Sequence, residues 1–549
     1  MAYRSSLAGQ AVACLILVLL LLGPMPSAQA QPPTPGEVRD SLRQRLPSPG
    51  QEAPAPQFQK PAAPRPETVT GERRVLVKRF VFSGNTLFSE DELRAVLAAW
   101  EGKELTLGEI YGSAERLTEF YQEQGYSVST VTVPAQRMRE GILRLEVVEG
   151  RVGKLTFEGN ERYSDSFLER RVRRAGSGVV LRFIDLERDL LLMNDLPGLT
   201  ARATLTPGDD YGLTDIHFRT EEKTFDAEVT VDNHGSEDIG GWRAGVDFTI
   251  NNPCTFGDVL SLGYTHSEAG LLRQGRISYG FPILYEGTRL NLSYSRAEYD
   301  VGGEFSALGI DGVSATARAL LSHPLIRGRR TNLFVLLGAA QLRGRSDLSG
   351  ASLSDDEVNF LETGFAFNRR HDSGGMSTFS GLLATNFQSN SDGTDSDALP
   401  PRIDLNGTYE HPFGRGWSGF LRGEAVLSND AMPDSNKFAI GGPDSIRGFI
   451  ISSLRGDRGA AGTLELRRFM SFRLADLMMR GFIDAGQVWY ENRPDDGGSS
   501  DSLVGAGVGL SVLFAKKYSM DVQWASPIDG NDSGDGDNSR LWLSFSAGF

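Results

Sequence analysis

Two segments near the C-terminus carry the residue types of a structural ion pair. The sequence Ile446-Arg447-Gly448-Phe449 lies in a long segment, residues 428–461, that interrupts a series of alternating strands. Asp484 lies in such a strand, Phe482-Ile483-Asp484-Ala485-Gly486, and shares a face with Gly486. Arginine binds a carboxylate through two parallel hydrogen bonds, which fixes the geometry of both groups. The pattern predicts that Arg447 docks its segment on this strand. The alternative is a solvated arginine and an aspartate that only lines a polar surface.

The strand that precedes Asp484 supplies a second acidic group. Glu465 and Arg467 alternate with Leu464 and Leu466, so the two charged side chains share one face. Leucines on the other face suit contact with lipid, which would turn Glu465 towards the same interior as Asp484. Glu465 is therefore a second expected residue of the docking strands.

No segment matches a common catalytic or nucleotide-binding motif. The chain has no Gly-x-x-x-x-Gly-Lys-Ser/Thr loop, no His-Glu-x-x-His helix and no Gly-x-Ser-x-Gly elbow, and its six histidines are scattered. The acidic segment 529–537 lacks the terminal glutamate of an EF-hand, so a solvated surface loop is favoured over a calcium site. A net charge of −15 argues against nucleic-acid binding, which requires a basic surface. We expect no catalytic residue, no cofactor, no metal and no nucleic-acid partner.

The first 30 residues are typical of a secretory signal peptide. Arg4 precedes an apolar run, residues 11–22, and Ala28-Gln29-Ala30 is a small-residue cleavage site. A lipoprotein site at Cys14 is disfavoured, because cleavage there would leave part of the apolar run on the mature chain. Once the leader is removed, Cys254 is the only cysteine, so we expect stability from burial or sheet closure rather than from a disulfide.

Residues 31–72 are predicted to form a linker, because prolines are frequent in them and favour an extended, semi-rigid chain. Within the linker, Val38, Leu42 and Leu46 share one side at helical spacing, which predicts a short helix over residues 37–46. The alternative is a transient turn, since a helix of this length is marginal on its own.

An internal repeat follows the linker. Phe82-Ser83-Gly84-Asn85 recurs 75 residues later as Phe157-Glu158-Gly159-Asn160. Both units have the pattern strand, helix, helix, strand, strand, and capping boxes that begin at Ser89 and Thr106 mark two helix starts in the first unit. We expect two small α+β domains, residues 73–150 and 151–223. The expected strands include 75–82, 127–133, 141–149, 200–206 and 213–220, and the helices of the second unit are expected near 164–174 and 183–194.

From about residue 224 the helical period disappears, and alternating segments separated by Gly, Asn and Asp turns continue to Phe549. A period of two with one apolar and one small, polar face is typical of barrel strands between lipid and water. In residues 541–549, expected to close the barrel, Trp542 is the only bulky side chain on the polar face. The pattern favours a barrel over a soluble β-sandwich, which would not need so many faces suited to lipid.

We therefore expect a membrane β-barrel of about 16 antiparallel strands over residues 224–549, an even number, as single-chain bacterial barrels require. Its long polar surface loops are expected at 344–356, 389–400, 490–503 and 526–540. The expected strands are 227–232, 242–251, 258–267, 272–281, 288–299, 313–323, 331–344, 357–371, 375–388, 401–411, 417–427, 462–469, 480–489, 504–514, 518–525 and 541–549.

The chain resembles a known superfamily at these motifs. Ile446-Arg447-Gly448-Phe449 is similar to the V/I-R-G-Y/F motif, and Phe482-x-Asp484-x-Gly486 to the F-x-D-x-G motif, of the outer-membrane assembly barrels. The two N-terminal repeats resemble the polypeptide-transport-associated (POTRA) domains of two-partner secretion transporters, the TpsB haemolysin and filamentous-adhesin secretors. Ile446 departs mildly from the valine that is frequent at its position.

The resemblance implies an arrangement and a function. It implies that residues 428–461 fold inward, that Arg447 meets Asp484 in the lumen and that the helix 37–46 plugs the barrel. It further implies an outer-membrane location in a Gram-negative bacterium, with both POTRA domains in the periplasm. The expected activity is export of a large, unfolded, TpsA-like β-helical exoprotein without nucleotide hydrolysis. Expected partners are this client, outer-membrane lipid and the barrel-assembly machinery that inserts the chain.

Client binding is expected at an exposed strand edge of a periplasmic domain, where an extended chain can form main-chain hydrogen bonds. One candidate edge is residues 200–206; the other is 127–133, and in particular Ser127, Val128, Ser129, Thr130 and Val131. The alternative role of both is domain core. Two other functions stay open: a factor that assembles other barrel proteins, which the two repeats and the linker disfavour, and a passive porin, which would not need periplasmic domains.

Overall fold

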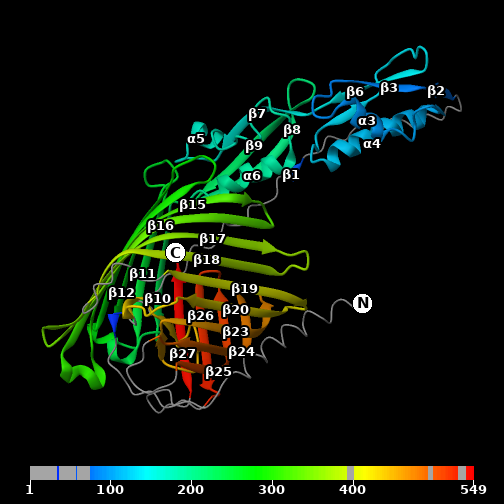
Figure 1. Cartoon of the computed structure of the whole chain (residues 1–549). Helices are drawn as coiled ribbons and strands as arrows, with labels where there is room; N and C mark the ends of the chain where they lie inside the picture. Colours follow the sequence, from blue (N-terminus) through cyan, green and yellow to red (C-terminus); the bar gives the residue numbers. More distant parts are fainter. Residues whose placement is uncertain (1–33, 36–56, 59–73, 392–400, 492–498, 530–538) are drawn as a thin grey trace.

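The computed structural model describes residues 34–35, 57–58, 74–391, 401–491, 499–529 and 539–549. Figure 1 shows two parts: a lobe of helices and short strands, and a large barrel from whose end that lobe extends. The expected signal peptide and the expected helix over residues 37–46 lie outside the described residues.

None of the helices in the part of the chain that the structure describes is long and apolar enough to cross a membrane.

The first unit of the lobe has a three-stranded sheet with strand order β3-β6-β5 and a separate β2–β4 pair. Both predicted capping boxes are present, at the starts of α3 and α4. The predicted strand 75–82 is two strands that break at Lys78, whose N–H donates to the Gly141 carbonyl. The elements are β2 (Val75–Val77), β3 (Arg79–Ser83), α3 (Glu90–Val96), β4 (Lys103–Leu105), α4 (Leu107–Glu123), β5 (Thr130–Thr132) and β6 (Ile142–Val148).

The second unit has a sheet with strand order β1-β8-β9-β7, in which Gln57 and Phe58 of the linker form the edge strand β1. The helix predicted near 164–174 is only α5, because the N–H groups of Arg174 and Ala175 donate to the Asp189 carboxylate instead of continuing a helix. The elements are β1 (Gln57–Phe58), β7 (Arg151–Glu158), α5 (Asp165–Glu169), α6 (Phe183–Asn194), β8 (Leu199–Pro207) and β9 (Leu213–Glu222).

The repeated Gly-Asn pair has a packing reason in both units. Gly84 and Gly159 have φ angles of +84° and +87°, and a Cβ at either position would overlap a carbonyl oxygen of the neighbouring strand. A glutamate then anchors each following loop: Glu149 accepts hydrogen bonds from the Leu87 N–H and the Thr86 N–H, and Glu222 accepts them from residues 161–163. The repeat in the sequence is therefore a repeated turn geometry.

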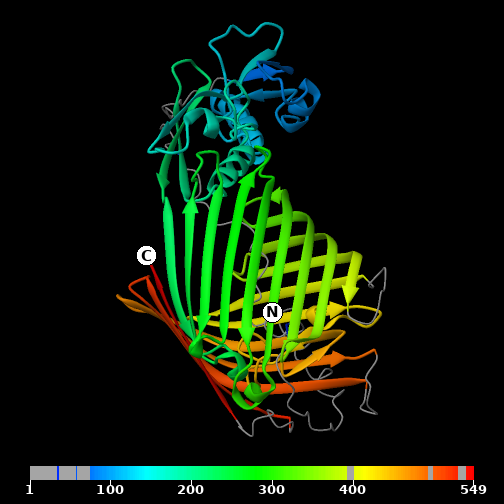
Figure 2. The same ribbon diagram turned by 90° about the vertical axis from the view of Figure 1, so that its left-hand side faces the viewer.

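Sixteen strands close the barrel, and each pairs with its neighbour in antiparallel register. Figure 2 shows the strands rising side by side beneath the lobe. Closure joins Glu228–Asp232 of β10 to Ser544–Gly548 of β27. The strands are β10 (Phe225–Asp232), β11 (Arg243–Asn251), β12 (Val259–Ser267), β13 (Leu272–Pro282), β14 (Arg289–Asp300), β15 (Ile310–Arg327), β16 (Thr331–Leu348), β17 (Ala351–Arg370), β18 (Met376–Ser391), β19 (Arg402–Gly414), β20 (Trp417–Leu427), β23 (Arg458–Ser471), β24 (Ala475–Trp489), β25 (Ser500–Phe514), β26 (Tyr518–Pro527) and β27 (Arg540–Gly548).

The predicted fold class, a barrel of about 16 strands after two α+β units, is confirmed, but one predicted loop is wrong. Residues 344–356 continue β16 and β17 as a ladder that turns at Ser349-Gly350. Charged side chains such as Arg345 and Asp347, which pair at 3.0 Å, end the apolar pattern there without ending the strand. Polarity marks the limit of the lipid-suited face, whereas the backbone ladder continues beyond it.

The second unit is fixed to the turns at the near end of the barrel. The buried guanidinium of Arg327, the last residue of β15, binds the Asp195 carboxylate at 2.8 and 2.7 Å. Arg162 donates to the carbonyl oxygens of Asn252 and Pro253 between β11 and β12. Paired charges and backbone bonds therefore hold the lobe against the barrel entrance.

Asp189 makes the stability of the second unit depend on pH. Burial raises the pKa of its carboxyl to about 6. The folded state therefore holds the proton more tightly than the unfolded state, so the stabilisation is complete below about pH 4 and is lost as the pH rises through about 6. One pKa unit corresponds to about 1.4 kcal/mol, so we expect a loss of about 3 kcal/mol between pH 4 and pH 7.

Asp189→Asn should remove most of this pH step, because the amide keeps an oxygen that can accept the same hydrogen bonds without ionising. Helix melting of the detergent-solubilised protein at 222 nm, compared at pH 4 and pH 7, measures it, since α3 to α6 lie in the lobe. An equal pH step in the wild type and in Asp189→Asn would contradict the prediction.

Candidate functional site

Residues 428–461 fold into the barrel rather than away from it. The segment contains η4 (Asp434–Asn436), β21 (Phe438–Ile440) and β22 (Leu454–Gly456), and β21 pairs with β22. The predicted segment ends four residues early, at Asp457, because residues 458–461 already pair with β20 and β24 as part of β23; we call residues 428–457 the inward loop. Its apolar side chains pack against strand residues that face the lumen, and this cluster is Val426, Phe438, Ile440, Ile446, Phe449, Leu454, Val488 and Leu503.

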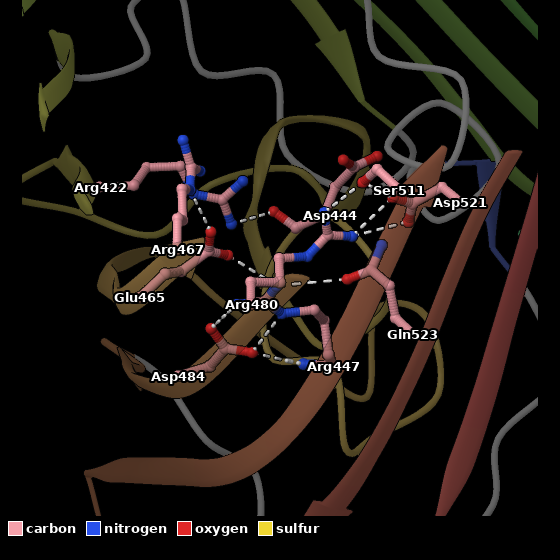
Figure 3. Close-up of polar contacts among 10 residues, drawn as sticks. All are labelled: Arg422, Asp444, Arg447, Glu465, Arg467, Arg480, Asp484, Ser511, Asp521 and Gln523. Carbon is pink, nitrogen blue, oxygen red and sulfur yellow. Dashed lines mark hydrogen bonds and ion pairs between the residues drawn. The ribbon is translucent and has the colours of Figure 1, made fainter. Parts of the chain in front are cut away.

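The structure brings Arg447 and Asp484 together. Arg447 Nε and an Nη atom bind the two carboxylate oxygens of Asp484, each at 2.7 Å, and the Arg447 backbone N–H donates to the same group at 3.2 Å. Figure 3 shows the two side chains meeting between the inward loop and β24. Asp484 is completely buried and Arg447 is 5% exposed. The pair has the two-bond geometry that orients both groups.

Three further strand residues complete the surroundings of Arg447. The second Nη atom binds Glu465 at 2.8 Å and the Gln523 side-chain oxygen at 3.2 Å. The Phe482 ring lies against the guanidinium, with its centroid 3.3 Å from Cζ. Glu465 also binds Arg467 at 2.7 Å, so two arginines and two carboxylates balance one another. Buried charge is tolerated because each group is paired.

Glycines allow the loop to approach the wall closely. A Cβ on Gly448 would lie 2.8 Å from the backbone nitrogen of Pro527, and one on Gly507 would lie 2.6 Å from the Phe482 ring. A Cβ on Gly486 would lie 3.3 Å from the Ile440 side chain of the inward loop. Gly448 and Gly507 exclude larger side chains because backbone and ring atoms occupy the space, whereas a Cβ at Gly486 would make only a tight contact.

Several residues of the site were not predicted. Trp542 Nε1 donates to the Arg447 carbonyl at 2.8 Å, and the Arg422 guanidinium donates to the Asp444 carbonyl. Arg480 binds Asp521 at 2.7 Å on the strands beside the loop (Figure 3). The position of Trp542 on a small, polar face was a signal that it has a special contact. Alternation alone could not indicate which loop atoms the other side chains reach.

The predicted client edge in the first unit is shorter than expected. Ser127 and Val128 form a turn, and buried Ser129 accepts a hydrogen bond from the Gly150 N–H. Of the five residues named for this edge, only Thr130 and Val131 belong to β5, and the Thr118 hydroxyl of α4 accepts the Val131 N–H at 2.9 Å. The turn forms because the Ser129 N–H bonds back to the Tyr126 carbonyl.

The predicted plug residues Val38, Leu42 and Leu46 lie outside the described residues. Pro35, which is described, is buried beside Gly344 of β16 and Ser435 of the inward loop. In the described ranges no group of three or more His, Cys, Asp or Glu side chains could hold a metal ion.

The arrangement has the geometry of a docking site. Arg447 pairs with Asp484 and Glu465, and the two carboxylates in turn hold its side chain in one orientation. Removing one partner of a buried ion pair costs about 3–5 kcal/mol, because the remaining charge is left unpaired. The cluster therefore stabilises the inward position of the loop.

Comparison with known proteins identifies similar chains. Residues 212–512 match the family described as haemolysin secretion/activation protein ShlB/FhaC/HecB, and residues 75–150 match the ShlB-type POTRA domain. The heme/hemopexin transporter protein HuxB of Haemophilus influenzae is 25% identical over 478 residues, 83% of either chain. The outer membrane transporter CdiB of Dickeya dadantii is 24% identical over 449 residues, 78% of this chain and 79% of that one. The solved structure of CdiB from Escherichia coli covers 100% of this chain and 98% of its own, with a TM-score of 0.74 at 20% identity, and shares its fold.

We expect Arg447→Ala or Asp484→Ala to leave the barrel inserted but to free the inward loop and abolish secretion of the exoprotein partner. The physical reason is the unpaired buried charge that either change leaves behind. Heat-modifiable migration measures barrel integrity, and immunoblotting of culture supernatants measures secretion.

Arg276→Ala is the matched control, because Arg276 pairs with Asp247 at 2.8 Å in a more exposed setting away from the loop. Secretion should persist in this variant. Wild-type secretion by both Arg447→Ala and Asp484→Ala would contradict the prediction that this ion pair is required for secretion.

Proposed function

Because the chain belongs to the haemolysin secretion/activation protein family ShlB/FhaC/HecB and is a two-partner secretion transporter of the outer membrane, we propose that it exports one large exoprotein whose unfolded chain its periplasmic domains recognise. The observation that carries the proposal is the inward loop, held in the lumen by Arg447. A loop folded into the barrel suits a channel that must stay closed until a client arrives.

Export is proposed to proceed without nucleotide hydrolysis. The sequence contains no Walker-type phosphate loop, and the domains on the periplasmic side are small α+β units. An unfolded client that folds outside cannot easily return, so folding itself can drive net movement. Arg447 and its partners are proposed to hold the resting state, and the loop must shift when a client enters.

Recognition is proposed to occur at the β8 edge of the second unit. The supporting observation is that this edge already receives an extended segment of the same chain: β1 pairs in parallel with β8, Gln57 opposite Thr204 and Phe58 opposite Leu205. An edge that adds one strand has the main-chain donors and acceptors to add another. A client strand would take the place of β1.

The β5 edge of the first unit has fewer main-chain groups that can form hydrogen bonds with a client. In β5 the N–H of Val131 is already used by Thr118, so a client would have to displace that hydroxyl. The strand has only three residues, which limits the hydrogen bonds that an added chain can form. We therefore rank β5, with Thr130 and Val131, below β8 as the proposed client edge.

The second candidate function is assembly of other outer-membrane barrels, because the arginine loop motif resembles that of the assembly barrels. Deletion of the gene distinguishes the two. Export predicts loss of one large secreted protein with the outer-membrane protein profile unchanged, whereas assembly predicts a broad decrease of barrel proteins. Quantitative proteomics of supernatants and outer membranes measures both, with complementation by the wild-type gene as control.

The client edge predicts a local change in amide exchange. An unfolded N-terminal fragment of the exoprotein partner should slow exchange over Leu199–Pro207 by about tenfold, since an added strand protects main-chain amides. Hydrogen–deuterium exchange with mass spectrometry on the detergent-solubilised protein measures it. The same fragment folded beforehand is the control, and protection at neither β8 nor β5 would exclude strand addition.

A further inference from the structure

Trp542 breaks the pattern of its strand and contacts two parts of the lumen. It lies on β27, is 5% exposed and donates from Nε1 to the Arg447 carbonyl at 2.8 Å. Its ring meets the His234 ring edge to face, with centroids 5.8 Å apart. Gln523, opposite Trp542 on β26, contacts the Arg447 side chain. The last two strands therefore hold both the backbone and the side chain of Arg447.

His234 lies two residues beyond the end of β10, where the barrel closes. The β10–β27 ladder joins only five residue pairs, and it is the shortest between neighbouring strands of the described barrel. Asn233 extends it: its side chain accepts the Leu543 N–H at 2.7 Å and donates to the Leu541 carbonyl at 2.8 Å. These two residues flank Trp542. We call the pairing of β10 with β27 the seam. The indole therefore lies where the inward loop meets the seam.

We propose that Trp542 is a positioning residue that couples the docked state of the inward loop to the closed state of the β10–β27 seam. When Arg447 sits on Asp484, its carbonyl orients the indole, and the indole supports the His234 end of the seam. When the loop leaves, Trp542 loses its acceptor and the short ladder loses that support. The inference deepens the proposed function because it gives the export channel a way to widen as the loop departs.

The N–H group, rather than the bulk of the ring, carries the coupling. Phenylalanine at this position keeps an aromatic ring against His234 but cannot donate to the Arg447 carbonyl, which is then left without this partner. Loss of one buried hydrogen bond shifts an equilibrium by roughly three- to tenfold. Opening events of the empty channel report this shift without any client, so the test is independent of export.

The experiment is single-channel recording of the full-length protein in planar bilayers. Trp542→Phe should raise the frequency of high-conductance openings about fivefold. Trp524→Phe is the matched control, because Trp524 faces outward on β26, is 49% exposed and should leave the frequency unchanged. Heat-modifiable migration confirms that each barrel is folded.

A disulfide across the seam then distinguishes openings that require the seam to separate from openings caused by release of the loop alone. In a Cys254→Ser background, Thr230→Cys and Ser546→Cys place two thiols at opposed positions of the seam. Oxidation should return Trp542→Phe to the wild-type frequency, and reduction should restore the increase. An increase that persists in the oxidised protein, no increase at all, or an equal increase in Trp524→Phe would each overturn the proposal.

Asn233→Ala provides a second test at the same end of the seam. It removes support at the same end of the seam and leaves the indole in place, so it should also raise the opening frequency. The double variant, with Trp542→Phe and Asn233→Ala, should open no more often than the more active single variant, because both changes weaken the same end of the seam. Additive effects would mean that Trp542 and the seam act separately.

Discussion

The inward loop depends on one requirement: a buried arginine must keep its carboxylates. Arg447 binds Asp484 through two bonds and Glu465 through a third, in a place where solvent cannot replace them. Undocking would leave the buried Asp484 carboxylate without its arginine, whereas Glu465 would keep Arg467, so the loop has a well-defined resting position. The same network can also be broken all at once, because a single side chain holds it together. A channel that must be closed at rest and open during export needs both properties.

The wall of the barrel is built to receive that arginine. Glycines on β24 and β25 let the loop and the Phe482 ring approach, and Gln523 and Trp542 on the last two strands reach the same residue. The site therefore combines a central ion pair from β24 with contacts from the strands that close the barrel. The residues that hold the inward loop therefore lie beside the strands that close the barrel, so movement of the loop is expected to affect the pairing of these strands.

The periplasmic lobe consists of two similar units, of which the second is attached to the barrel. Each unit repeats a Gly-Asn turn anchored by a glutamate, and the second unit is held at the barrel entrance by the Arg327–Asp195 pair. Its open edge carries a short strand from the linker, β1. A client that replaced this strand would be held directly beside the entrance, since the unit that bears the edge is fixed to the barrel turns.

The barrel of about 16 strands and the two α+β units could be predicted from the sequence, because side-chain alternation, capping boxes and the Gly-Asn repeat are local consequences of lipid contact and backbone geometry. The sequence also indicated that Arg447 and Asp484 are special, and that Trp542 is an exception on its face. Which residues contact one another across the lumen depends on the closed barrel and could not be predicted from the sequence. Gln523 and Trp542 reach Arg447 because barrel closure brings β26 and β27 beside the inward loop, and alternation along a strand carries no information about contacts across the lumen. For the same reason, the strand expected at Ser127 to Ser129 became a turn, since contacts with Tyr126 and Gly150 outweighed local β-propensity.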